Sequence, residues 1–98
     1  EKEFSRQHVQ GVEKRREQLC ESLRKAGAKV FNTKTNFLIV DVENADSFSR
    51  KTRAQGVLVR PLSNYASVIP ALKRIVRIAI PQTKFQKECT RVLIKSLH

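Results

Sequence analysis

Hydrophobic residues recur along this chain with two spacings, one typical of helices and one typical of strands. Over residues 5–26 they come every three or four positions, apart from Arg16, and Gly27 follows as a natural helix end. Residues 36–42 are short, rich in β-branched residues and almost continuously apolar, which predicts a central strand with Phe37 in the core. The apolar face of the first predicted helix is formed by Val9, Val12, Leu19, Leu23 and Ala26.

A second, short helix and a second strand follow in the middle of the chain. Residues 45–55 are bounded by Asn44, a residue suited to the N-cap, and by Gly56, which ends the helix. Residues 57–60 read Val-Leu-Val-Arg and predict a strand, which Pro61 stops because proline has no N–H to donate to a sheet.

The last part of the chain predicts a long loop, a third strand and a closing helix. The loop covers residues 61–73, and loops of such length in compact domains are often functional. Residues 75–80 predict the strand, which Pro81 ends. Thr83 begins the closing helix, and Gln86 three positions later completes the pattern of a capping box. The apolar face of that helix comprises Phe85, Cys89, Val92, Leu93 and Leu97.

The order helix, strand, helix, strand, strand, helix predicts an α+β fold, in which helices pack on a small, mainly antiparallel sheet of about three strands. With 98 residues the chain is long enough for one core, so we expect a single domain over residues 1–98. Hydrophobic residues make up 40% and charged residues 30%, a balance that argues against disorder. Ferredoxin-like RNA-binding domains share this architecture, so the fold alone does not choose a function.

Several kinds of protein and site are disfavoured by what the sequence lacks. The apolar runs are too short for a membrane span, and no basic-then-apolar leader opens the chain. Cys20 and Cys89 match no zinc or redox spacing, which predicts no metal site and a reduced, cytoplasmic protein. His8 and His98 stand alone, so neither is expected to be catalytic. The chain contains no Met and begins with Glu1, which favours a piece of a longer protein.

The chain is strongly basic, with 20 Lys and Arg against 9 Asp and Glu and a formal net charge of +11. The excess is uneven, because Glu88 is the one acidic residue in the stretch 61–98. Such a balance indicates an anionic partner: nucleic acid, a membrane surface, or a phosphorylated or carboxylated ligand. A solvated basic face explains the charge equally well.

Two arginines in predicted strands are the candidate binding residues. Arg60 is the last residue of one strand, and Arg77 interrupts an otherwise apolar strand. An arginine there is costly unless it is paired or meets an anion, and its planar fork fits a carboxylate or a phosphate. The simpler interpretation is an edge-strand arginine that faces solvent. No Ser–His–Asp or Cys–His set and no Gly-rich phosphate loop accompanies them, so we predict no catalytic residues in this chain.

Three runs of residues resemble, in order, the motifs of one known family. Residues 36–40 read Asn-Phe-Leu-Ile-Val, residues 56–61 read Gly-Val-Leu-Val-Arg-Pro with Tyr65 after them, and residues 76–80 read Val-Arg-Ile-Ala-Ile. They resemble the Asn-Phe strand, the Gly-Val-x-Val-Arg-Pro stretch and the Leu-Arg-Ile-x-Ile strand of histidinol-phosphate aminotransferases. These are pyridoxal-phosphate-dependent enzymes of class I/II and fold type I. The resemblance covers nearly the whole chain, as the C-terminal small domain of that family.

The resemblance implies a reaction and a role for both arginines. The family transfers an amino group between glutamate and imidazole-acetol phosphate in histidine biosynthesis. By resemblance, Arg77 falls on the position that grips the anionic group of the substrate, and Arg60 on a neighbouring position that helps bind the phosphate. The cofactor, pyridoxal 5′-phosphate, and the lysine that binds it belong to the family's large domain, so this domain alone is expected to be inactive. The parent is expected to be a homodimer in which this domain contacts its own large domain.

Departures from the family pattern keep alternatives open. Pro81 stands in place of the usual Gly turn, Ala66 replaces a Gly, and residues 73–75 are added before the last strand. Another class I/II aminotransferase or a related decarboxylase is therefore an alternative. A basic nucleic-acid-binding module is another, although the predicted strands at 57–60 and 75–80 carry no aromatic residue on which bases could stack. A third is an interaction or regulatory fragment in which neither arginine matters.

Overall fold

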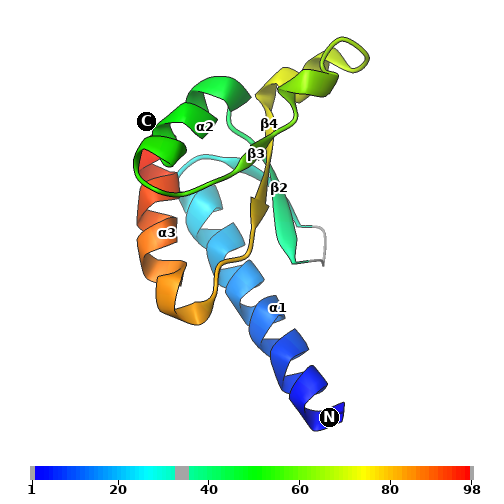
Figure 1. The fold of residues 1–98 in the computed structure, drawn as a ribbon, viewed down its shortest axis with the longest axis vertical. Coiled ribbons are helices and arrows are strands. Elements are labelled where there is room, and N and C mark those ends of the chain that lie inside the picture. Colours follow the sequence, from blue (N-terminus) through cyan, green and yellow to red (C-terminus); the bar gives the residue numbers. More distant parts are fainter. Residues whose placement is uncertain (1, 33–35, 98) are drawn as a thin grey trace.

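The computed structural model describes residues 2–32 and 36–97, whose elements follow the predicted order with one strand added. They are α1 (Lys2–Lys25), β1 (Lys29–Asn32), β2 (Phe37–Asp41), α2 (Ala45–Ala54), β3 (Arg60–Pro61), β4 (Ile75–Ala79) and α3 (Thr83–Ser96). The connection predicted as a loop, between β3 and β4, carries the 3-10 turns η1 (Ser63–Tyr65) and η2 (Pro70–Arg74). Figure 1 shows α1 and α3 side by side, with the start of α1 projecting beyond the rest of the domain.

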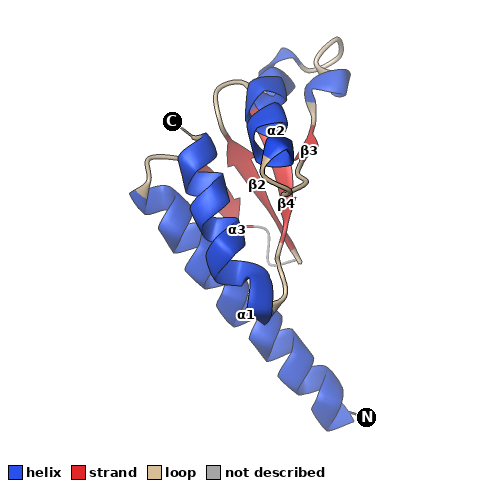
Figure 2. Ribbon diagram, turned by 60° about the vertical axis from the view of Figure 1, so that its left-hand side comes forward, coloured by secondary structure: helices blue, strands red, loops and turns tan. Residues whose placement is uncertain are grey.

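The strands form one antiparallel sheet in the order β1-β2-β4-β3, which confirms the predicted α+β class. β2 and β4 are the central strands, and they pair along their whole length, from Phe37 opposite Ala79 to Asp41 opposite Ile75. The helices α1, α2 and α3 lie against one face of this sheet (Figure 2). No helix in the described part of the chain covers the other face, which we name the open face.

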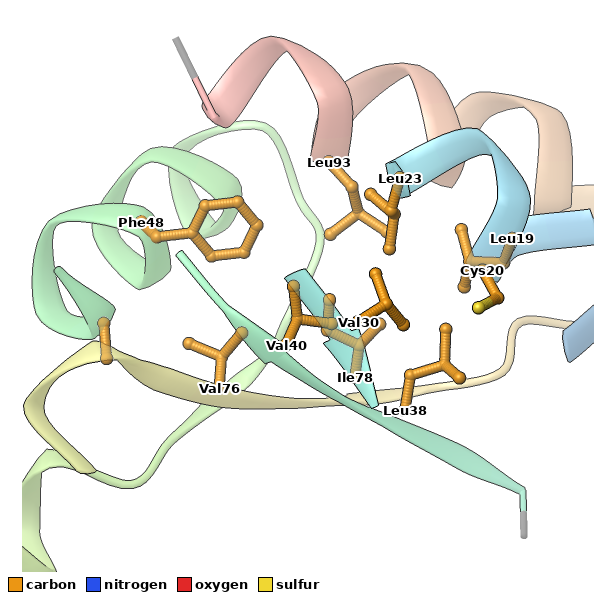
Figure 3. Packing of buried hydrophobic residues seen from close by; sticks show 11 residues of the cluster. Leu19, Cys20, Leu23, Val30, Leu38, Val40, Phe48, Val76, Ile78 and Leu93 are labelled. Carbon is orange, nitrogen blue, oxygen red and sulfur yellow. The ribbon is translucent and has the colours of Figure 1, made fainter. Parts of the chain in front are cut away.

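The hydrophobic core lies between the helices and the sheet. Leu38 and Val40 of β2 and Val76 and Ile78 of β4 are at most 2% exposed and point toward the helices. Their helix partners, seen in Figure 3, are Leu19, Cys20 and Leu23 of α1, Phe48 of α2 and Leu93 of α3. Burial of each large apolar side chain contributes about 1.5–3 kcal/mol. Because side chains alternate along a strand, this packing also fixes which strand residues point to the open face.

The ends of the helices follow the caps that the sequence predicts. The side-chain oxygen of Asn44 accepts a hydrogen bond from the Ser47 backbone N–H at 2.9 Å, which confirms the N-cap of α2. Gly27 and Gly56 follow the first two helices with φ values of +99° and +84°. This left-handed conformation suits glycine and closes a helix at its C-terminal end.

The predicted strands were partly wrong. Three strands were expected, but β1 adds a fourth at the edge of the sheet. Of the described side chains of β1, only Val30 is buried. The sequence of this short strand therefore shows almost no alternation of apolar and polar residues from which a strand could be predicted. The strand predicted at 57–60 is displaced, and β3 begins at Arg60. The Val57 N–H bonds instead to the Thr52 carbonyl at 2.9 Å, in the turn that closes α2, which delays the entry of the chain into the sheet.

The capping box predicted at Thr83 is also absent. α3 has Gln82 as its N-cap, and the helix begins without a side-chain cap bond. The Gln86 amide, expected to complete the box, donates to the backbone oxygen of Arg15 and to the Gln18 side chain, both at 3.2 Å. Gln86 therefore joins α3 to α1. The acceptors on α1 compete with the backbone at the start of α3, which the capping box would have used.

Candidate anion-binding site on the open face

The two predicted binding residues, Arg60 and Arg77, lie next to each other on the open face. β3 pairs with β4 so that Arg60 stands directly opposite Arg77. The register continues across the sheet, with Ile39 of β2 opposite Arg77 and Phe31 of β1 opposite Ile39. Directly opposite residues of antiparallel strands point to the same face. The four side chains therefore form one row across the whole sheet, with Arg77 half-buried and Arg60 exposed.

The charges of Arg60 and Arg77 are not offset by a carboxylate within the described part of the chain. No salt bridge between either guanidinium and an aspartate or glutamate is found among the described side chains. Like charges directly opposite each other destabilise a sheet, so the pair carries an electrostatic cost. An anion held by both groups would offset this cost and accept charge-assisted hydrogen bonds from both forks.

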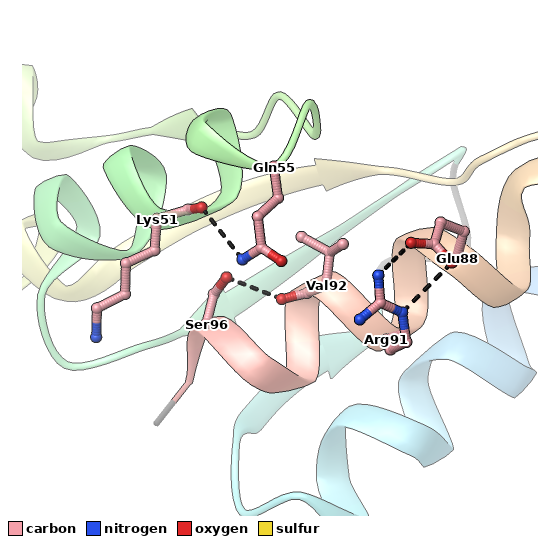
Figure 4. Close-up of polar contacts among 6 residues, drawn as sticks. All are labelled: Lys51, Gln55, Glu88, Arg91, Val92 and Ser96. Atoms are coloured by element: carbon pink, nitrogen blue, oxygen red, sulfur yellow. Dashed lines mark hydrogen bonds and ion pairs between the residues drawn. The ribbon is translucent and has the colours of Figure 1, made fainter.

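Acidic residues of the neighbouring elements have partners of their own. Asp41, at the end of β2, is paired with Arg74, whose Nε lies 3.2 Å from both carboxylate oxygens. Glu88 pairs with Arg91 along α3 (Figure 4), on the helix side of the sheet. The hydrogen bond from Arg91 and its positive charge hold the pKa of Glu88 below the usual value. Both carboxylates are therefore paired with other arginines, although Asp41 lies on the open face, two positions along β2 from Ile39.

Phe37 lies beside Arg77 on the open face, and its predicted place in the core was wrong. Its side chain is half-buried, and the guanidinium carbon of Arg77 lies over its ring, 5.0 Å from the centre. A cation in this position is attracted by the face of the ring. A second aromatic residue, Phe31, is 55% exposed on the open face and was missed because its strand was not predicted.

A third arginine, Arg15 of α1, anchors the turn that follows β4, and the sequence did not single it out. Its Nε donates to the Pro81 carbonyl oxygen at 3.1 Å, and its Nη1 donates to the Thr83 hydroxyl at 3.2 Å. One signal could have identified it, because it lies four positions before Leu19 and so on the apolar side of the helix. Arg15 thereby fixes the end of the strand that carries Arg77.

The described lysines bear on the prediction that no cofactor-binding lysine lies in this chain. Every lysine side chain that is described, from Lys14 to Lys95, is exposed, whereas desolvation is one way in which a Schiff-base lysine is activated. Among the described residues, no lysine therefore has the desolvated setting that would activate it by this route. Burial raises the pKa of the Cys20 and Cys89 thiols, which lowers their thiolate fraction and so their reactivity as nucleophiles.

Among the side chains that the structure describes, no cluster of three or more His, Cys, Asp or Glu residues is arranged to hold a metal ion. Of the helices described, none has the length and apolar character needed to cross a membrane. The described geometry does bring the two predicted binding residues, Arg60 and Arg77, together on the open face.

Three comparisons with known proteins found similar sequences and a similar fold. The sequence model of the family described as aminotransferase class I and II matches residues 1–94. A histidinol-phosphate aminotransferase of Chlorobaculum parvum (strain DSM 263 / NCIMB 8327) is 52% identical over 40 residues, which are 41% of this chain and 11% of that protein. A solved structure from Burkholderia pseudomallei K96243, assigned as an aminotransferase, matches 95% of this chain with a TM-score of 0.78 and 21% identity.

The three matches differ in what they establish. At 21% identity, the solved structure supports the fold alone, and this chain spans 27% of its length. The curated relative is matched over a short segment only. The family model, in contrast, covers residues 1–94 and so nearly the whole sequence. This chain therefore belongs to the class I and II aminotransferase family.

Proposed function

We propose that this chain is the C-terminal small domain of an aminotransferase of the histidinol-phosphate type. In this proposal Arg77 grips the anionic group of the substrate and Arg60 helps to bind its phosphate. The observation that carries the proposal is the pair itself, two arginines directly opposite each other on the open face with no acidic partner among the described side chains. The chain belongs to a family of transferases, which bind substrates, so a substrate is the anion that we propose for this pair.

The chemistry of the pair suits a phosphate or a carboxylate. Each guanidinium presents its N–H donors in a planar fork, and two forks on adjacent strands can hold different oxygens of one dianionic phosphate. Both arginines would supply binding and orientation, which lower the barrier by fixing the reacting group in place. The proposed reaction is amino transfer between glutamate and imidazole-acetol phosphate. It is supported by the 52% identity, over 40 residues, to a relative named as a histidinol-phosphate aminotransferase.

The cofactor and partners follow from the same proposal. The family is generally dependent on pyridoxal 5′-phosphate, which when bound supplies the electron sink for amino transfer. We infer that a large domain outside this chain holds the cofactor, because the chain spans only 11% of the curated relative and 27% of the solved structure that it matches. The small domain would pack against that large domain, would be inactive alone, and would belong to a cytoplasmic homodimer.

Substitution of the two arginines in the parent enzyme tests the proposal. Arg77→Ala and Arg60→Ala are expected to lower kcat/KM for the phosphorylated substrate roughly 10- to 150-fold each, since a charge-assisted hydrogen bond is worth about 1.5–3 kcal/mol. Arg91→Ala is the matched control, because Arg91 is exposed on α3 and pairs with Glu88. An unchanged kcat/KM in Arg77→Ala would contradict the assignment.

The substrate itself needs a separate measurement. A panel of amino donors and acceptors separates the histidinol-phosphate type from another class I/II aminotransferase and from a related decarboxylase. A decarboxylase would release carbon dioxide from an amino acid and need no second substrate. Transfer from glutamate to a phosphorylated keto compound, lost in Arg60→Ala but retained for a substrate without phosphate, would support the proposed role of Arg60.

Nucleic-acid binding has one observation in its favour. Phe31 is 55% exposed on β1 and Phe37 lies on the adjacent strand β2 beside Arg77, so aromatic side chains share the open face with a basic one. Sheets that read RNA stack bases on exposed aromatic residues. Titration with single-stranded RNA tests this alternative. Salt-dependent, micromolar binding would favour it, and no binding at low salt would exclude it.

A further inference from the structure

Phe37 occupies a position from which it can orient Arg77. The two residues lie on neighbouring central strands, where Phe37 stands opposite Ala79 and Arg77 stands opposite Ile39. They are therefore diagonal neighbours on the open face, a separation that an aromatic ring and a long side chain can bridge. The guanidinium carbon of Arg77 lies 5.0 Å from the centre of the ring, within the range of a cation–π contact.

Contact with the ring leaves the hydrogen-bond donors of Arg77 available to a ligand. An aromatic ring has no lone pair that accepts a conventional hydrogen bond, so the five N–H donors of the guanidinium are not consumed. A carboxylate partner would consume them, as Asp41 does for Arg74, whose Nε lies 3.2 Å from both oxygens. The ring can thus restrain Arg77 without competing with an anion.

We propose that Phe37 is a positioning residue for Arg77, whose guanidinium it holds in the orientation that binds an anion. This inference rests on the proposed function, in which Arg77 grips the anionic group of the substrate. An arginine side chain in solvent has a large rotamer entropy, and a ligand that immobilises it must offset the loss. Because Phe37 already restricts Arg77, binding of the anion loses less freedom there than at the exposed Arg60.

This role depends on aromatic character more than on size. Phe37→Leu keeps an apolar side chain at the half-buried position but removes the ring, whereas Phe37→Tyr and Phe37→Trp keep a ring under the guanidinium. We expect Phe37→Leu to weaken the binding of inorganic phosphate roughly 2- to 10-fold. The two aromatic variants should bind phosphate within about 2-fold of the native chain.

The experiment is a titration of inorganic phosphate into the 98-residue chain, followed by NMR at the Nε–Hε group of Arg77. Because the guanidinium lies over the ring, we expect the ring current of Phe37 to displace this signal in the native chain and Phe37→Leu to remove the displacement. Phe31→Leu is the matched control, because Phe31 lies in the same row as Arg77 but Ile39 separates them. It should change neither the signal nor the affinity. Urea unfolding of each variant verifies that it is folded.

The outcomes separate this inference from the proposed function. Weaker binding in Phe37→Leu, recovered by either aromatic variant, supports the positioning role. Binding that Phe37→Leu leaves unchanged but Arg77→Ala abolishes overturns the positioning role and leaves the proposed function intact. A loss that neither aromatic variant recovers also overturns it, because packing alone would then explain the effect. If Arg77→Ala binds phosphate like the native chain, the proposed function fails and the role of Phe37 fails with it.

Discussion

Arg60 stands directly opposite Arg77 across β3 and β4, so two positive charges share one register position on the open face. No salt bridge to a carboxylate offsets either charge among the described side chains. The arrangement that favours binding of an anion by Arg60 and Arg77 therefore lowers the stability of the sheet. Each charge that attracts a ligand also repels the charge beside it while the ligand is absent.

Arg60→Gln is expected to raise the free energy of unfolding by roughly 0.2–1 kcal/mol at low salt, because it removes this repulsion. The same substitution should weaken phosphate binding. Urea titrations at low and high ionic strength measure the first effect, which should shrink as salt screens the charges. Arg91→Gln is the control, since Arg91 already has Glu88 as a partner and its neutralisation offers no such gain. A less stable Arg60→Gln at low salt would contradict the expected repulsion.

Arg15→Ala is expected to lower the free energy of unfolding by about 1–2 kcal/mol. It removes the hydrogen bonds that tie the Pro81 carbonyl and the Thr83 hydroxyl to α1. Arg15→Lys should recover only part of the loss, because an ammonium group lacks the forked geometry. Lys14→Ala, at an exposed position of the same helix, should change stability by less than about 0.5 kcal/mol. Equal stability of the two alanine variants would mean that water replaces both bonds.

Features set by local sequence could be predicted, and Arg77 is the clearest case. Alternation over residues 75–80 places Val76 and Ile78 on one face and Arg77 on the other, and the structure buries the first two. The N-cap at Asn44 is local in the same sense, because the accepting side chain and the N–H that it binds are three residues apart. Such features need no knowledge of the rest of the fold.

Features that depend on strand pairing could not be predicted. The placement of Arg60 opposite Arg77 is set by the connection through η1 and η2 and by bonds such as Leu62 N–H to the Ile75 carbonyl at 2.9 Å. Phe37 was misplaced because the run 36–42 is almost continuously apolar and so lacks the alternation that identifies the inward face. Tertiary packing decides which face such a strand buries.

Asn44→Ala is expected to lower the free energy of unfolding by about 0.5–2 kcal/mol, because it leaves the Ser47 N–H at the start of α2 without its side-chain acceptor. Asn44→Asp should retain stability, since aspartate caps a helix as well as asparagine. Urea unfolding measures both. Asn64→Ala is the matched control, because Asn64 is exposed in η1 and the same change there removes no helix cap. A similar loss in both alanine variants would argue against the cap as the cause.

The two cysteines are expected to differ in their reactivity toward a thiol reagent. Cys20 is 1% exposed in the core and Cys89 is half-buried on α3, so the reagent can reach Cys89 first. Burial raises the pKa of both thiols, which lowers the thiolate fraction relative to free cysteine at about pH 8. Since the thiolate is the nucleophile, both should react more slowly than free cysteine.

Reaction with Ellman's reagent between about pH 7 and pH 10 measures these rates, with Cys20→Ser and Cys89→Ser used to assign them. The rate of Cys89 should continue to rise at pH values where the rate of free cysteine has levelled off, because its thiol deprotonates later. Cys20 should stay slow until urea unfolds the chain, after which both should react like free cysteine. Equal, fast reaction of both thiols in the native chain would contradict the packing of α1 against the sheet.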